Sequence, residues 1–168
     1  MIYRPDPDSK QHQTRLAVQS HLEELIPSRE TLESLAIKCA QEPSPDNTFE
    51  YAFCLAKSAS KDERRYSITI LDNLVKEGYE HQIDCMYGSA VAYFLNKRPD
   101  KARINCEAIL RAQPEHKLAT DLHLACLDAI QEQEAKSVEK IVIGSSAAIA
   151  GVGLALGVAG MLLGGKKR

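Results

Sequence analysis

The residues best suited to chemistry are two histidine–cysteine pairs at helical spacing. His81 and Cys85 could share one helix face, and so could His123 and Cys126. A structural zinc site needs four ligands, and these two pairs fall on different predicted helices. A nucleophilic Cys85 would also need an acidic residue to orient its histidine, and the sequence indicates none. We therefore expect no metal site and no catalytic residue.

The signatures of other enzyme chemistry do not occur in the sequence. It contains no H-E-x-x-H, G-x-x-x-x-G-K-[ST] or G-x-S-x-G motif. The formal net charge is −2, and three of the cations are the last three residues, so the rest of the chain is more acidic still. That balance disfavours nucleic acid as a partner. We expect a protein without a cofactor that binds other proteins. The charged run at 61–65, KDERR, fits a solvated helix start, and a partner contact there stays open.

Cysteine usage indicates a reducing compartment. The number of cysteines is odd, no C-x-x-C pair occurs, and the N-terminal residues contain no apolar stretch of the kind a secretory signal needs. Small buried side chains in a cytosolic body are the simplest interpretation of Cys39, Cys54, Cys85, Cys106 and Cys126.

The C-terminal segment has the composition of a membrane anchor. Residues 141–165, beginning at Ile141, carry no charge and contain seven of the nine glycines. A helix of that length spans roughly 37 Å, which exceeds a hydrocarbon core of about 30 Å. We predict a basic linker at 136–140, a transmembrane helix at 141–165 inserted after synthesis, and a basic targeting tail of Lys166, Lys167 and Arg168. A buried core helix is the alternative.

Glycines in this segment recur at the spacing of close helix contacts. Gly153 and Gly157 form one G-x-x-x-G pair, and Gly160 and Gly164 form another. Such pairs support helix association in membranes, so a homo-oligomer is possible. The alternative is that the glycines only lower the hydrophobicity of the segment.

The rest of the chain predicts an all-α fold of short, antiparallel helices. Pro27, Pro43, Pro45 and Pro99 mark boundaries, Ser28 is a predicted N-cap, and Gly78 suits the position after a helix. We predict a flexible N-terminal arm at 1–13 and a cytosolic helical domain at 14–135. Its helices are expected at 14–26, 28–40, 46–59, 61–77, 80–96, 99–112 and 114–139.

Part of this domain has tetratricopeptide-like spacing. Ala90, Tyr93, Ala102 and Pro114 occupy the positions at which paired helices cross closely and a repeat ends. An imperfect earlier copy contains Tyr51 and Leu55. Two degenerate repeats are marginal alone, so we expect further helices to cover them and to leave one concave side.

These features together resemble the mitochondrial fission 1 protein family. The resemblance rests on FEYAFCLAKS at 49–58, on KEG at 76–78, on LRAQPEHKLA at 110–119, and on the tail GVGLALGVAG with its basic tip. It implies a tetratricopeptide-like bundle of six to seven helices plus a C-terminal transmembrane helix, with no enzymatic activity.

The resemblance also implies a function and a location. The expected protein is a tail-anchored adaptor of the mitochondrial outer membrane and the peroxisomal membrane, with its N-terminal domain in the cytosol. It would promote organelle fission by recruiting a dynamin-related GTPase or its adaptors. A concave groove would receive the partner, or the chain's own N-terminal arm. Carried onto this sequence, the implied groove residues are Phe49, Ala52, Ala56, Tyr87, Val91 and Leu95.

Plain packing between helices is the alternative role for each of these groove residues. For the whole protein, the alternative is a tail-anchored adaptor with a task outside fission, such as chaperone docking. Chaperone-type grooves carry Lys and Arg clamps, and the residues in the predicted groove do not provide them.

Overall fold

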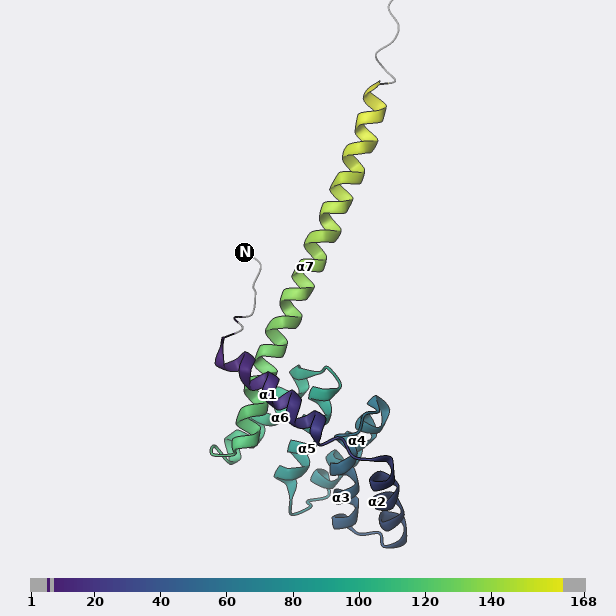
Figure 1. The fold of residues 1–168 in the computed structure, drawn as a ribbon, viewed down its shortest axis with the longest axis vertical. Helices are drawn as coiled ribbons and strands as arrows, with labels where there is room; N and C mark the ends of the chain where they lie inside the picture. The colour runs from purple at the N-terminus through teal and green to yellow at the C-terminus, as the bar shows by residue number, and fades with distance from the viewer. Residues whose placement is uncertain (1–5, 7, 162–168) are drawn as a thin grey trace, which may run out of the picture. The chain divides into compact units, whose positions relative to one another are not determined.

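The described residues form seven α-helices and no strand. The computed structural model describes residue 6 and residues 8–161, with the backbone alone at residue 142 and at residues 144–161. The all-α prediction is confirmed. The helices are α1 (Lys10–Glu24), α2 (Arg29–Gln41), α3 (Pro45–Leu55), α4 (Lys61–Lys76), α5 (Gln82–Leu95), α6 (Pro99–Ala112) and α7 (Lys117–Met161) (Figure 1).

Serine residues start the first four helices. In each case the serine hydroxyl accepts a hydrogen bond from the backbone N–H three residues later, which satisfies one donor that the helix leaves unpaired. The capping residues are Ser9, Ser28, Ser44 and Ser60. The predicted cap at Ser28 is therefore confirmed.

Three helix boundaries in the body differ from the sequence prediction by three residues or more, and the others differ by two residues at most. Helix α1 begins at Lys10, four residues early, because Ser9 caps a polar first turn that carries no apolar periodicity. Helix α3 ends at Leu55, because the Arg64 side chain donates to the carbonyls of Ser58 and Ala59 and holds the next turn open.

Helix α7 begins three residues after Pro114, which lies exposed in the preceding turn. The ring of His116 accepts a hydrogen bond from the Ala119 N–H, and so caps this helix in place of proline.

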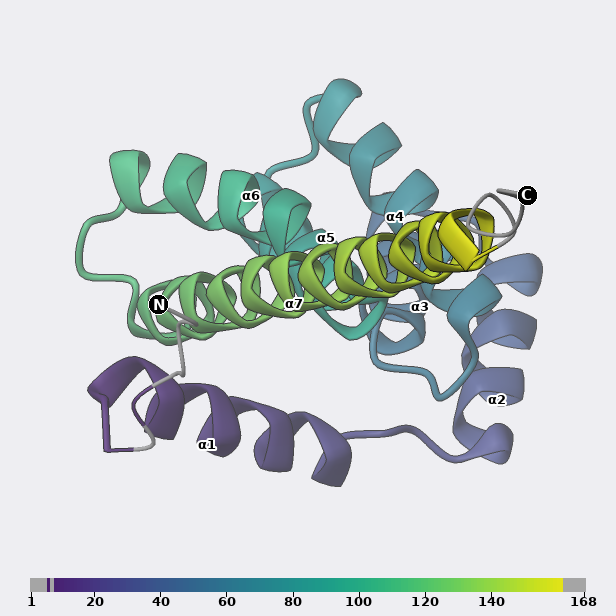
Figure 2. The same cartoon turned by 90° about the horizontal axis from the view of Figure 1, so that it is seen from above.

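Consecutive helices pack against one another in the main body. This compact unit comprises residues 5–130. Helix α2 contacts α3, α3 contacts α4, α4 contacts α5, and α5 contacts α6 (Figure 2). A further contact joins α3 to α5, the first helices of the two repeats. This order is the one expected of tetratricopeptide-like pairs.

Small side chains permit the close helix crossings. Among the predicted repeat residues, Ala90 and Ala102 have no exposed surface and Leu55 is buried, whereas Tyr51 and Tyr93 are half-buried. Two clusters form the core of the body. One contains Ala90, Ala102, Cys106, Leu122 and Cys126, and the other contains Ala52, Leu71, Cys85 and Ala92.

A second unit contains residues 131–168. Its described part is the rest of α7, which is helical through the predicted linker at 136–140, and Lys136 pairs there with Glu132 at 2.6 Å. Where side chains are described, no helix combines the length and apolarity needed to cross a membrane. Gly153, Gly157 and Gly160 lie in α7. In the predicted anchor the side chains of Ile141 and Ile143 are described and exposed. The remaining side chains of that segment, Gly164 and the tail Lys166, Lys167 and Arg168 lie outside the described residues.

Candidate partner-binding pocket

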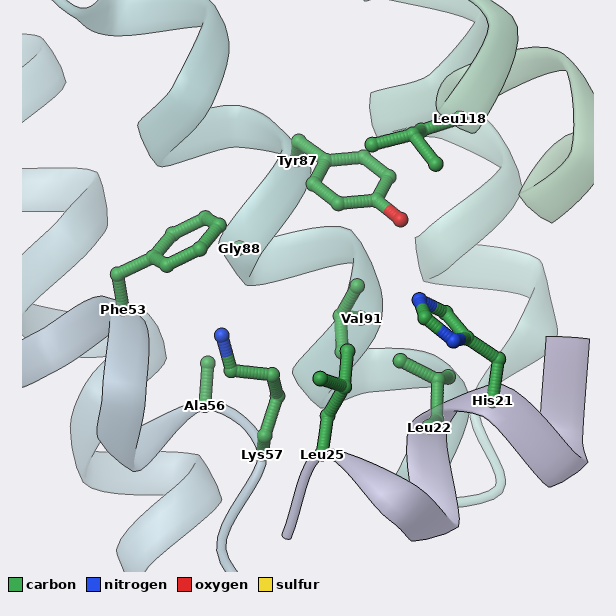
Figure 3. Close-up of a pocket in the computed structure, with 10 residues that line it drawn as sticks. All are labelled: His21, Leu22, Leu25, Phe53, Ala56, Lys57, Tyr87, Gly88, Val91 and Leu118. Carbon is green, nitrogen blue, oxygen red and sulfur yellow. The ribbon is translucent and has the colours of Figure 1, made fainter. Parts of the chain in front are cut away.

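An apolar pocket of about 140 Å³ opens where the first helices of the two repeats meet α1 (Figure 3). One wall comes from the end of α3 and the turn after it, a second from α5, and a third from α1, with one residue from α7. The lining residues are His21, Leu22, Leu25, Phe53, Ala56, Lys57, Tyr87, Gly88, Val91 and Leu118.

Three of the predicted groove residues meet in this pocket. Ala56, Tyr87 and Val91 all line it, as expected for the first helices of two adjacent repeats. Tyr87 is half-buried, and its ring lies 5.8 Å from that of His116. Burial raises the pKa of Tyr87 to about 12.

The other three predicted groove residues lie elsewhere. Ala52 is 0% exposed and packs in the second core cluster, because this side of α3 faces α4 and α5 rather than the opening. Leu95 lies two turns from Tyr87 along α5 and packs against the first core cluster.

Phe49 belongs to a separate aromatic cluster at the start of α3. Its ring lies 5.2 Å from Phe53, 5.6 Å from Tyr79 and 6.3 Å from His81. The Tyr79 hydroxyl donates to Asp46 at 2.8 Å, which ties this cluster to the first turn of α3. Phe49 therefore supports the position of Phe53 instead of lining the pocket.

Phe53 and Gly88 are pocket residues that the sequence analysis missed. A Cβ atom built at Gly88 would lie 2.9 Å from the Phe53 ring and 2.9 Å from Leu71. Real Cβ atoms do not approach that closely, so the ring can hold its place only against glycine. The spacing of Phe53 four residues after Phe49 was the available signal for its side of the helix.

Lys57 is the one Lys or Arg among the lining residues. Its ammonium lies 4.2 Å above the centre of the Phe53 ring and extends into the pocket (Figure 3). Burial lowers the pKa of Lys57, and Cys54 opposes that shift weakly. Among the described residues, no carboxylate forms an ion pair with Lys57.

Helix α1 is fastened to the body by a buried carboxylate. Oδ2 of Asp128, on α7, accepts from Arg15 at 2.5 Å and lies 3.1 Å from the His12 ring. Leu22, about two turns after Arg15 along α1, is buried in the first core cluster. The α1 wall of the pocket is therefore a packed part of the fold.

The histidine–cysteine pairs lie in surroundings unsuited to nucleophilic chemistry. Cys85 is fully buried, and burial raises its pKa to about 11, so it stays a thiol. His81 is exposed beside Glu80 and Asp84. The five cysteines are free, and no group of metal-ligating side chains gathers within the described part of the chain.

The chain is similar to proteins of organelle division. It is 29% identical over 123 residues to the mitochondrial fission 1 protein of Homo sapiens, which covers 73% of this chain and 80% of that protein. It is 28% identical over 120 residues to the mitochondrial fission 1 protein of Candida glabrata, covering 71% and 77%. No protein-family model matches the chain.

The fold is similar to solved structures of the same name. The crystal structure of Fis1 from Saccharomyces cerevisiae superposes with a TM-score of 0.63 at 20% identity, over 70% of this chain and 95% of that one. Yeast Fis1 in complex with an Mdv1 fragment superposes with a TM-score of 0.62 at 20% identity, over 67% and 94%. The resemblance inferred from the sequence is thus confirmed, and in sequence and in fold the chain is similar to the mitochondrial fission 1 proteins.

Proposed function

We propose that this protein is a non-catalytic adaptor that promotes mitochondrial fission by holding a protein partner in the pocket between α1, α3 and α5. The observation that supports this most is the joint occurrence of the fold and the pocket. The body resembles a fission protein in sequence and structure, and its apolar pocket lies on the side where the first repeat helices meet. Apolar pockets with a few polar groups are typical of binding sites for protein segments.

The proposed partner is a dynamin-related GTPase or one of its adaptors. In one similar structure, yeast Fis1 is in complex with an Mdv1 fragment that contains an N-terminal extension and coiled-coil domains. A partner of this kind would offer a helix whose apolar side chains can enter a pocket. The pocket of about 140 Å³ is large enough for one apolar side chain.

The proposed location is the mitochondrial outer membrane and the peroxisomal membrane, with the helical body in the cytosol. The uncharged segment 141–165, between Lys140 and Lys166, supports a single-pass anchor. The test is to fuse residues 136–168 to a fluorescent protein and to image it. Mitochondrial and peroxisomal outlines are expected, and uniform endoplasmic reticulum staining would refute the location.

The function itself is tested by deletion and rescue. Cells that lack the full chain should show elongated mitochondria and fewer peroxisomes, because division would be slowed. Re-expression of the chain should restore both, whereas Tyr87→Ala should not, because it removes the largest pocket side chain. Tyr66→Ala is the matched control, since Tyr66 is an exposed ring on α4 outside the pocket.

Two results would refute this function. Unchanged organelle morphology in the deletion would separate the protein from fission. Full rescue by Tyr87→Ala would separate fission from the pocket. The helical content of Tyr87→Ala is measured in parallel, so that a folding defect is recognised. If that variant unfolds, Tyr87→Leu, which keeps apolar bulk, takes its place.

A further inference from the structure

Lys57 is a cation in an apolar place, and no carboxylate of the described residues pairs with it. It lies two residues after the end of α3, is half-buried, and lines the pocket with Phe53, Ala56 and Val91. Among the described residues, the ammonium makes a cation–π contact with the Phe53 ring, whose centre lies 4.2 Å away. The attraction between an ammonium and the face of an aromatic ring offsets only part of the cost of taking that charge out of water.

The surroundings of Lys57 leave this cost in place. Burial lowers the pKa of Lys57 and outweighs the opposing effect of Cys54, a thiol whose own pKa is raised by burial. The other titratable side chains of the pocket are His21 and Tyr87, and neither supplies a negative charge at neutral pH. A carboxylate brought to the pocket would therefore gain more here than at an exposed lysine.

The apolar space lies directly beside this ammonium. Leu22 of α1 and Leu25 just after it line the pocket together with Val91 of α5, and the Lys57 ammonium lies beside them on the side toward Phe53 (Figure 3). A ligand that fills the space with an apolar side chain would place its neighbouring residue at the ammonium. Charge complementarity then selects an acidic neighbour.

We propose that the pocket binds a segment of a protein partner in which an Asp or Glu side chain lies next to an apolar side chain, with the carboxylate pairing to Lys57. This inference rests on the proposed function only in taking the ligand to be a protein. The apolar side chain enters between α1 and α5. Helix α1 remains docked, because three of its residues form the wall against which that side chain packs.

The test uses the full chain in lipid nanodiscs and a random linear peptide library in which both ends of each peptide are joined to the display protein. Selected peptides are expected to share Asp or Glu beside Leu, Ile, Met or Phe. Lys57→Glu should lower the affinity for these peptides about tenfold or more, because it sets a like charge against the carboxylate.

The charge reversal in Lys57→Glu should also create a new preference, for basic peptides. Peptides selected for binding to the Lys57→Glu chain should carry Lys or Arg beside the apolar residue. Lys57→Gln, which only removes the charge, should retain the apolar preference and lose the acidic one. Lys101→Glu is the matched control, because Lys101 is an exposed lysine on α6 outside the pocket, and it should leave the selected sequences unchanged.

Several results would overturn the inference. These are an absence of enriched peptides, apolar peptides without an acidic residue, and the same peptides selected by Lys57→Glu as by the unchanged chain. A second library with free C-termini that alone yields binders would also overturn it, because the anion would then be a terminal carboxylate, as in chaperone docking. Organelle morphology in the deletion reports on the fission function independently of all these outcomes.

Discussion

Arg15 and Asp128 form a buried ion pair that fastens α1 to α7. The two atoms that pair are Nε and Oδ2, 2.5 Å apart, and the side chains are 12% and 2% exposed. The helices that carry them lie far apart in the sequence, and His12 reaches the same carboxylate. The pocket depends on this pair, because the other half of α1 provides its third wall.

Asp128→Asn should lower the free energy of unfolding by about 3 kcal/mol, because it removes the buried negative charge that Arg15 and His12 both contact. Urea unfolding of the full chain in nanodiscs measures this. Glu50→Gln is the control, since Glu50 pairs with Lys38 at 2.6 Å on the surface, and it should cost less than about 1 kcal/mol. Equal losses in the two variants would contradict the structural role of the Arg15–Asp128 pair.

The same Asp128→Asn variant should weaken binding of the selected peptides. Loss of the pair loosens α1, and the apolar side chain of the ligand then loses the wall formed by Leu22 and Leu25. Tighter binding would instead mean that α1 covers the site and competes with the ligand.

The raised pKa of Tyr87 predicts that the folded state loses stability at alkaline pH. Its pKa is raised from 10.0 to about 12, so the folded state holds the phenolic proton after the unfolded state has released it. The contribution is therefore complete below pH 10 and is lost as the pH rises towards about 12. Tyr87→Phe should show a smaller fall in unfolding free energy over this range. An identical fall in both proteins would show that Tyr87 is accessible to water.

The C-terminal ends of α4 and α5 have the same backbone conformation, with glycine at the positive-φ position in one and lysine in the other. Gly78 after α4 and Lys97 after α5 both have positive φ, 79° and 61°. In each end the next N–H reaches back to a carbonyl five residues earlier, from Tyr79 to Leu74 and from Arg98 to Tyr93.

Lys97→Gly should therefore raise the free energy of unfolding by about 0.5–1 kcal/mol, because glycine adopts positive φ without strain. Gly78→Ala should lower it by about 1 kcal/mol for the same reason. Chemical denaturation of the two variants measures both changes in the free energy of unfolding. A loss in Lys97→Gly would mean that contacts of the lysine side chain outweigh its backbone strain.

Local chemistry made much of the fold predictable. Ser28, Pro99 and Gly78 mark helix ends because capping and ring constraints act over a few residues. The start of α6 at Pro99 and its end at Ala112 agree with the sequence prediction. The apolar spacing predicts too late a start for α1, because Ser9 is followed by polar residues and the apolar residues begin further along the helix.

The sequence by itself determined most of the helix ends and the paired repeats, since spacing and capping are properties of neighbouring residues. Only the tertiary structure decided which side chains reach the pocket. The rotation of α3 buries Ala52 and leaves Ala56 at the opening, while Gly88 admits the Phe53 ring. The tertiary structure also decided the surroundings of Lys57, because helices distant in the sequence partly remove its ammonium from water and place it over the Phe53 ring.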